Sequence, residues 1–222
     1  MEQKRITPMT TAGCFAAIML ILALLSTYLP FFSFIGYFIM PIPMTILFVK
    51  YGLRQAILLG ITAGILMGIF IDPLTAIIQI ATFGAVGIAL GAGFKEKWPP
   101  AKLLMGVTAA LIGTAIGLAA LMYGVMDVNI VAALGDVFDT LMQETMEQYK
   151  NSGMSELQLA ETKAQLEEVR RLLPTMLPMF MCLAMAIIAY VNVKVSQFFL
   201  QRLGFDVRPF LPIRYWEMPR GV

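Results

Sequence analysis

Long apolar stretches, separated by short polar turns, make up most of the chain. Six of them are long enough to cross a bilayer as a helix, which takes roughly 20 predominantly apolar residues. The six stretches are residues 11–29, 31–49, 55–71, 74–94, 102–123 and 175–195. This pattern predicts an all-α, polytopic membrane protein with six transmembrane helices.

Two of these stretches carry prolines. Pro41 and Pro43 interrupt the second stretch, while Pro174 precedes the sixth and Pro178 lies inside it. Because proline has no backbone N–H to donate, a kink or partial unwinding is expected at each place.

Composition supports a membrane environment for most of the chain. Of the 222 residues, 59% are hydrophobic and 14% are charged, and the mean hydropathy is +0.80. A soluble domain carries about 25% charged residues, so water alone could not solvate this surface. The net charge of +2 gives no reason to expect nucleic acid as a partner. We predict a membrane domain over residues 1–203 and a tail over residues 204–222.

The basic residues predict the orientation of the helices. Twelve of the sixteen lie at the N-terminus, after the second and fourth stretches, or in the tail. They are Lys4, Arg5, Lys50, Arg54, Lys95, Lys97, Lys102, Lys194, Arg202, Arg208, Arg214 and Arg220. Since cytoplasmic ends are enriched in Lys and Arg, we expect both termini inside, in a bacterial plasma membrane.

One long acidic loop, residues 125–173, lies on the opposite side in this topology. Apolar residues recur at helical spacing in its first half, and Asn151-Ser152-Gly153 then breaks the pattern. Ser155 and Gln158 have the spacing of a capping box for a second helix. We therefore predict an extracytoplasmic amphipathic helical hairpin. Two roles stay open for it: a lid over a pocket, or a cover for the membrane surface and its own neighbours.

The tail interleaves aromatic and basic residues. Phe205, Phe210, Tyr215 and Trp216 alternate with Arg208, Arg214 and Arg220. Such a segment after a cytoplasmic helix end is typical of contact with anionic lipid. The lipid bilayer is therefore the expected partner of the tail.

Catalytic chemistry is missing from the sequence. The chain has no histidine, and Cys14 and Cys182 both lie in apolar stretches. There is no phosphate-binding P-loop, and no charged residue lies at the centre of a predicted span. We expect neither an enzyme nor a metal or cofactor site.

Small residues recur every fourth position in three of the stretches. They are Gly60, Gly64 and Gly68, then Gly87 and Gly91, then Ala109, Gly113 and Gly117. Such ridges let helix backbones approach closely in lipid. Packing within the bundle is favoured over an oligomer interface.

Polar and aromatic residues near the outer ends of the helices are the candidate ligand-binding set. They are Tyr28, Phe32, Asp72, Gln79, Tyr123 and Asp127. An aromatic pocket with a few polar groups suits a small organic solute. The alternative, an interfacial aromatic belt with ordinary helix-end polarity, is favoured for any single residue of the set.

Several motifs resemble a family of uncharacterised bacterial membrane proteins, the YybS-like group. The motifs are Tyr28-Leu29-Pro30, Met40-Pro41-Ile42-Pro43, Lys50-Tyr51-Gly52-Leu53-Arg54, Pro209-Phe210-Leu211-Pro212 and Tyr215-Trp216-Glu217-Met218-Pro219. That group is similar to the substrate-binding S components of energy-coupling-factor vitamin transporters. The resemblance implies six helices, a vitamin or metal bound near the outer face, and docking on a transmembrane coupling subunit with two ATPases.

The resemblance also implies a partner-binding surface. In S components an Ala-x-x-x-Ala pattern on the first helix contacts the coupling subunit, and Ala12 and Ala16 have that spacing here. Two features depart from the pattern. YybS-like proteins commonly continue with further helices after the tryptophan-containing tail, so this chain is either a short member or a truncated form. The external hairpin is also larger than in S components.

The hypothesis that follows is an S-component-like protein that captures a small solute or partners a coupling module. The alternative is a non-transport scaffold or regulator in envelope assembly or signalling, acting through the hairpin and the basic tail.

Overall fold

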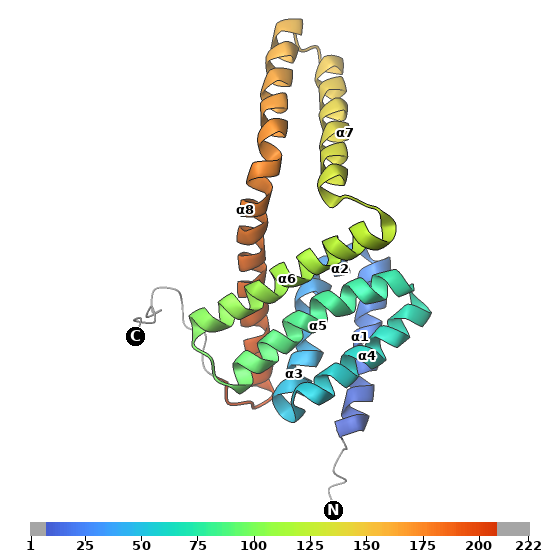
Figure 1. The fold of residues 1–222 in the computed structure, drawn as a ribbon, viewed down its shortest axis with the longest axis vertical. Coiled ribbons are helices and arrows are strands. Elements are labelled where there is room, and N and C mark those ends of the chain that lie inside the picture. Colours follow the sequence, from blue (N-terminus) through green and yellow to red (C-terminus); the bar gives the residue numbers. More distant parts are fainter. Residues whose placement is uncertain (1–7, 208–222) are drawn as a thin grey trace, which may run out of the picture. The chain divides into compact units, whose positions relative to one another are not determined.

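A computed structural model describes residues 8–207, and every regular element in that range is a helix (Figure 1). The helices are α1 (Pro8–Tyr28), α2 (Pro30–Ile39), α3 (Pro41–Tyr51), α4 (Leu53–Phe70), α5 (Pro73–Lys95), α6 (Pro100–Met126), α7 (Ile130–Asn151) and α8 (Glu156–Arg202). The predicted all-α class is therefore confirmed. Most of the tail, together with Lys4 and Arg5, lies outside the described residues.

The chain divides into two compact units. The bundle unit consists of the described residues up to Ala115 and from Met185 onward, and the hairpin unit is Ile116–Ala184. Helices α6 and α8 each contribute to both units. This division does not test the prediction of a single membrane domain over residues 1–203.

Six predicted membrane spans are matched by six helices that are long and apolar enough to cross a bilayer within residues 8–207. The corresponding segments are Pro8–Tyr28, Phe31–Tyr51, Leu53–Phe70, Pro73–Lys95, Pro100–Val125 and Glu156–Arg202. The number of candidate spans therefore agrees with the prediction, while the sidedness of the helices stays a prediction.

The second span is interrupted where the sequence predicts it. Helix α2 ends at Ile39, and Pro41 opens α3 at a position whose N–H needs no helical partner. Pro43 lies within the first turn of α3, so it causes no second break. Met40 keeps helical backbone angles and donates its N–H to the Gly36 carbonyl oxygen at 2.9 Å. The interruption is therefore slight.

At the sixth span, where a kink or partial unwinding is expected, the helix is not unwound, and the kink stays a prediction. Helix α8 runs without interruption from Glu156 to Arg202, with Pro174 and Pro178 inside it. The second arm of the hairpin and the sixth span are thus one helix. Proline in a helix interior removes a hydrogen bond, but long helices of membrane proteins tolerate that loss where neighbouring groups compensate.

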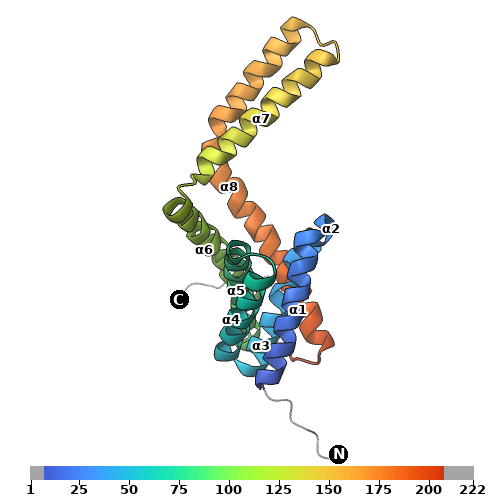
Figure 2. The same ribbon diagram turned by 90° about the vertical axis from the view of Figure 1, so that its right-hand side faces the viewer.

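Small residues bring the helices of the bundle unit together. Both views show α3 alongside α4 and α5 (Figure 1, Figure 2). A Cβ atom added at Gly91 of α5 would lie 2.5 Å from the Phe48 Cβ of α3, and one added at Gly87 would lie 2.8 Å from the Met44 Cβ. On α4, a Cβ added at Gly60 would lie 2.9 Å from the Met44 Cε. The glycines of α5 therefore set the spacing of α3 and α5, whereas at Gly60 the flexible end of the Met44 side chain could move.

The other glycines that were predicted to pack helices differ in how closely neighbouring atoms approach them. A Cβ added at Gly64 would lie 3.3 Å from Ile80, and one added at Gly68 would lie 3.8 Å from Pro73. Gly113 and Gly117 of α6 do not pack in this way, because a Cβ added at either meets no atom within 4 Å. Both glycines are exposed.

The hairpin unit contains the predicted turn. Helix α7 ends at Asn151, and Gly153 takes a left-handed backbone angle, φ +81°. The capping box is confirmed. The backbone N–H of Gln158 donates to Ser155 Oγ at 3.4 Å, and the backbone N–H of Ser155 donates to Gln158 Oε1 at 3.3 Å. Arg170 of α8 pairs with Asp139 of α7, with Nη2 2.5 Å from Oδ2. None of the side chains described in this unit is fully buried.

Candidate functional site

The predicted ligand-binding residues fall in both units. Tyr28, Phe32, Asp72 and Gln79 belong to the bundle unit. Tyr123 and Asp127 belong to the hairpin unit: Tyr123 is 62% exposed, and Asp127 has a left-handed backbone, φ +54°, directly after α6. A single pocket formed by all six residues stays a prediction.

Tyr28 and Phe32 flank the turn between α1 and α2. Tyr28 is 69% exposed and Phe32 is 38% exposed. Two serine hydroxyls hold this turn: Ser33 Oγ donates to the Ser26 carbonyl oxygen, and Ser26 Oγ donates to the Phe32 carbonyl oxygen at 3.4 Å. The two aromatic rings therefore lie on the surface of the bundle unit.

Asp72 is the N-cap of α5. Its Oδ1 accepts the Thr75 amide N–H at 2.8 Å, which satisfies one of the free amides at the helix start. Hydrogen bonds from the Thr75 side chain and backbone lower the pKa of the Asp72 carboxyl. Asp72 therefore stabilises the start of α5, whether or not it also contacts a ligand.

Gln79 is the member of the set with an unsatisfied buried atom. Its Oε1 is buried on α5 and has no hydrogen-bond partner among the described residues. Buried polar atoms are almost always hydrogen-bonded, so an orphaned one needs an explanation. Gln79 lies nearer Asp72 than Lys95 along α5, in the half of the helix that ends at the acidic turn.

Aromatic rings lie one helical turn from Gln79. Phe83 is on the same face of α5, four residues on. Its ring meets the ring of Tyr37 on α2 edge-on, with centroids 5.2 Å apart and an interplanar angle of 81°. Sequence reasoning missed Tyr37 and Phe83. The spacing of Gln79 and Phe83 was visible in the sequence, but the contact with α2 was not.

Ala12 and Ala16, the predicted partner-binding residues, are 8% and 1% exposed. They lie in one core cluster with Ala56 and Ala63, because α1 packs on α4. Their side chains are packing residues of the bundle, and a contact between α1 and a coupling subunit stays a prediction.

A second buried polar group lies on α8. Asn192 and Ser196, one turn apart, are 1% and 0% exposed. Asn192 Nδ2 donates to the Ile188 carbonyl oxygen at 3.0 Å, while Asn192 Oδ1 and Ser196 Oγ have no partner among the described residues. The sequence interpretation missed both residues, since neither is charged.

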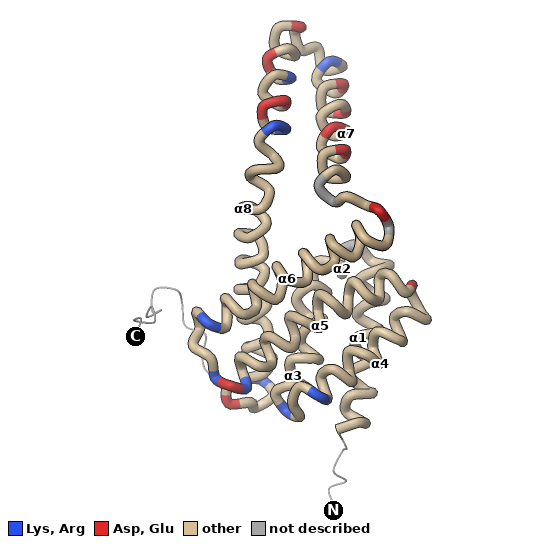
Figure 3. Tube along the Cα trace, viewed as in Figure 1, with Lys and Arg blue, Asp and Glu red and all other residues tan. Residues whose placement is uncertain are grey.

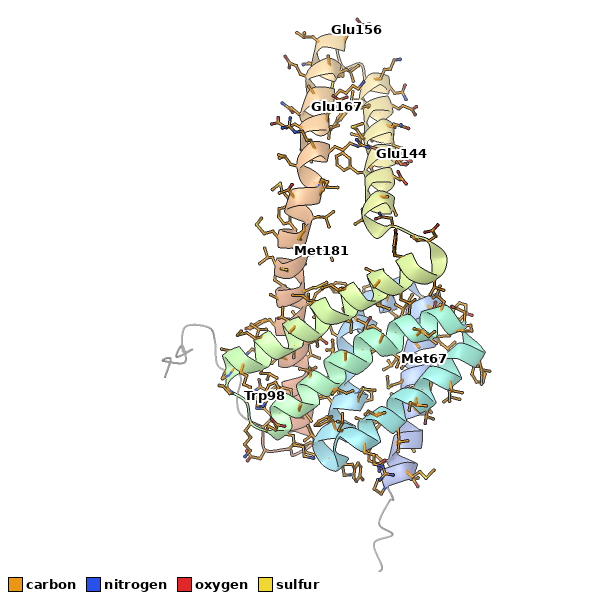
Figure 4. All side chains as sticks on the ribbon, in the orientation of Figure 1. Met67, Trp98, Glu144, Glu156, Glu167 and Met181 are labelled. Atoms are coloured by element: carbon orange, nitrogen blue, oxygen red, sulfur yellow. The ribbon has the colours of Figure 1, made fainter. Side chains whose placement is uncertain are left out.

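Lysines and arginines of the bundle unit gather at the turns from α3 to α4 and from α5 to α6 (Figure 3). Trp98, labelled in Figure 4, lies in the second turn, with the Lys102 Nζ 4.5 Å from the centre of its ring. Lys97 Nζ lies 2.5 Å from Asp206 Oδ2, and this contact lowers the pKa of the Asp206 carboxyl. The turns predicted to face the cytoplasm therefore form a basic end of the unit.

Acidic side chains follow both arms of the hairpin unit (Figure 3). Glu144 of α7 and Glu156 and Glu167 of α8 are three of them (Figure 4). Within residues 8–207, no three His, Cys, Asp or Glu side chains lie close enough together to hold a metal ion.

Comparison with known proteins places the chain in a family without assigning an activity. Residues 17–222 match the family described as "Predicted membrane protein (DUF2232)". The chain is also similar to the "Uncharacterized protein YybS" of Bacillus subtilis (strain 168), with 23% identity over 216 residues. That alignment covers 91% of this chain and 64% of the relative, so the chain spans less than two thirds of the relative's length. No solved structure matches the chain. Because the family match covers nearly the whole sequence, the chain belongs to the DUF2232 family of predicted membrane proteins.

Proposed function

We propose that this protein binds a small solute inside its bundle unit, as a membrane-embedded binding protein rather than an enzyme. The observation that carries the proposal is the buried, unpartnered Oε1 of Gln79, one turn from the Tyr37–Phe83 aromatic pair. An amide beside aromatic rings suits an organic molecule with a flat apolar part and a hydrogen-bond donor.

The energetics favour an occupant for Gln79. Leaving a buried acceptor unpaired costs about 1–3 kcal/mol. A solute N–H or O–H that donates to Oε1 recovers part of this free energy on binding. Packing against Tyr37 and Phe83 adds the burial of apolar area.

The proposed setting is a bacterial plasma membrane, with both termini and the basic turns on the cytoplasmic side. In that orientation Gln79 lies in the outer half of the bundle, and the hairpin is extracytoplasmic. A role like that of an S component follows, in which solute capture is joined to a transmembrane coupling subunit with ATPases. The resemblance noted from the sequence motifs supports this assignment.

The test is native mass spectrometry of protein purified from its own host, followed by thermal unfolding with the recovered small molecule. Gln79→Leu is expected to remove the bound mass and the ligand-induced rise in Tm. Gln143→Leu, an exposed glutamine on α7, is the matched control and should retain both. Co-purification of ATPase subunits with the wild type would support the coupling role.

A folded wild-type protein that repeatedly carries no small molecule would contradict solute binding. So would a bound molecule that Gln79→Leu retains at full occupancy.

The alternative function is a scaffold or regulator that acts through the hairpin. One observation favours it: Leu134, Val137 and Leu141 are exposed on α7, in a unit whose described side chains all keep some exposure. Exposed apolar side chains among acids suit docking of another protein. Val137→Asp together with Leu141→Asp would then abolish function while solute uptake and the fold persist. Loss of uptake instead would favour the binding protein.

A further inference from the structure

A groove runs between α1 and α4 on the surface of the bundle unit. Its volume is about 280 Å³. The lining residues are Met9, Ala12, Gly13, Gln55, Leu58 and Thr62. Most of this surface is apolar, and the polar side chain of Gln55 lies near the start of α4.

Gly13 leaves the groove open. A Cβ added at this glycine would meet no atom within 4 Å, in contrast to Gly60 on α4, where a Cβ would lie 2.9 Å from Met44. Gly13 therefore does not serve close packing between helices. The space beside it is available to a molecule from outside the unit.

The groove begins at the basic end of the bundle unit and runs toward the middle of the span. From Gln55 to Thr62, seven helical rises cover about 10 Å. The hydrocarbon of one leaflet is about 15 Å thick, half of the bilayer core. The apolar walls therefore lie beside the part of a lipid acyl chain that is nearest its headgroup.

Positive charge surrounds the start of α4. Arg54 lies next to Gln55 and, within the part of the chain that the structure describes, makes no ion pair. Lys95 Nζ would lie 3.4 Å from a Cβ added at Gly52, the N-cap residue of α4. The first amides of α4 receive no hydrogen bond from a capping side chain. A free helix N-terminus flanked by cations favours an anion.

Contacts at the end of α3 hold another cation near α1. The Lys50 Nζ lies 5.1 Å from the centre of the Tyr51 ring, and the Tyr51 hydroxyl lies 3.4 Å from Thr11 Oγ1. Thr11 precedes the groove residue Ala12. The positive charge therefore lies at the end of the groove where a lipid headgroup would be.

We propose that the α1–α4 groove binds one anionic phospholipid. An acyl chain lies against Gly13 and Leu58, and the phosphate meets Arg54 and the uncapped start of α4. The Gln55 amide is placed to donate to the headgroup or an ester oxygen. The proposal goes beyond solute binding and does not rest on it.

The test is native mass spectrometry of the delipidated full chain with phosphatidylglycerol or phosphatidylcholine added. The wild type should retain one phosphatidylglycerol more tightly than any phosphatidylcholine. Gly13→Phe should remove that lipid by filling the groove. Gly113→Phe, which adds the same ring at an equally open glycine of α6, is the matched control and should retain it.

Headgroup recognition is tested separately. Arg54→Gln should lower the preference for phosphatidylglycerol over phosphatidylcholine about fivefold, as expected for loss of one basic residue at a lipid surface. If Gly13→Phe is not monodisperse, Leu58→Trp fills the groove from the α4 wall and should give the same loss.

Three outcomes overturn the proposal. The first is full retention of phosphatidylglycerol by both groove-filling variants. The second is equal retention of the two lipids by the wild type. The third is unchanged lipid binding with loss of a co-purifying polypeptide in Gly13→Phe, which would assign the groove to a protein partner.

Discussion

The bundle unit and the hairpin unit are both built from helices, but their side chains are in different surroundings. In the bundle unit, Met19, Leu47 and Leu59 are completely buried. In the hairpin unit, every described side chain keeps some exposure, and the contacts that define it are a capping box and the Arg170–Asp139 pair. Close packing therefore stabilises the first unit, whereas local polar contacts shape the second. Changes in packing should be felt most in the bundle, and changes in polar contacts most in the hairpin.

The largest effect is expected from Gly91→Leu in the bundle unit. Its Cβ would lie 2.5 Å from the Phe48 Cβ, so α3 and α5 would have to separate. Overpacking of this kind typically costs about 1–3 kcal/mol, and sometimes more. Unfolding in a graded detergent mixture should begin earlier than for the wild type. Gly117→Leu, at an open position, is the control and should unfold like the wild type. Equal destabilisation by both variants would contradict the proposed difference between closely packed and open glycines.

A smaller effect is expected from Ser155→Ala in the hairpin unit. Loss of an N-cap side chain typically costs a helix about 1 kcal/mol. Hydrogen exchange should quicken in the first turns of α8 and in α7, and stay unchanged in α3 and α5. Ser152→Ala, at the end of α7, should leave the start of α8 unaffected. An equal change in the bundle amides would mean that the two units unfold together.

Arg170→Gln should have a weaker effect. Both partners of the Arg170–Asp139 pair are partly exposed, so water and salt screen the attraction. Exchange should quicken only where α7 and α8 face each other, and raising the salt concentration should reduce the difference from the wild type. Lys163→Gln, which breaks a longer pair with Glu167 within α8, should change less. A salt-independent effect would contradict this account.

Acid should produce the smallest effect. The pKa of Asp206 is lowered by Lys97, so this carboxyl contributes stability that is present above its unfolded pKa and lost as pH falls through the lower folded pKa. The contact should therefore weaken as the pH falls below about 4, the ordinary pKa of an Asp carboxyl. A carboxyl resonance assigned to Asp206 should titrate below the usual range, and return to it in Lys97→Met. An ordinary titration in the wild type would contradict the pairing.

Most of the fold follows from patterns within single stretches of sequence. The apolar lengths predict the six spans, Pro41 marks the interruption between α2 and α3, and the Ser155–Gln158 spacing predicts the start of α8. The uninterrupted course of α8 was missed because the effect of Pro174 depends on the neighbours that replace its lost hydrogen bond.

The candidate site was predicted in part. Gln79 stands out in the sequence because it is a polar residue in an apolar stretch. Tyr37, Phe83, Asn192 and Ser196 did not, since their importance depends on which helices meet and which atoms are left without partners. The same limit applies to glycine ridges: Gly91 and Gly117 have similar sequence surroundings, but of the two only Gly91 would bring an added Cβ within 4 Å of another atom.

Thiol labelling in intact cells tests the central claim, an even number of spans with the basic turns inside and the hairpin outside. Cys14 and Cys182 would first be replaced by serine, because both are exposed. A membrane-impermeant reagent should then label Glu156→Cys in intact cells, and Lys97→Cys only after the membrane is opened. Labelling of both positions from the same side would contradict the proposed topology, and with it the outer solute site.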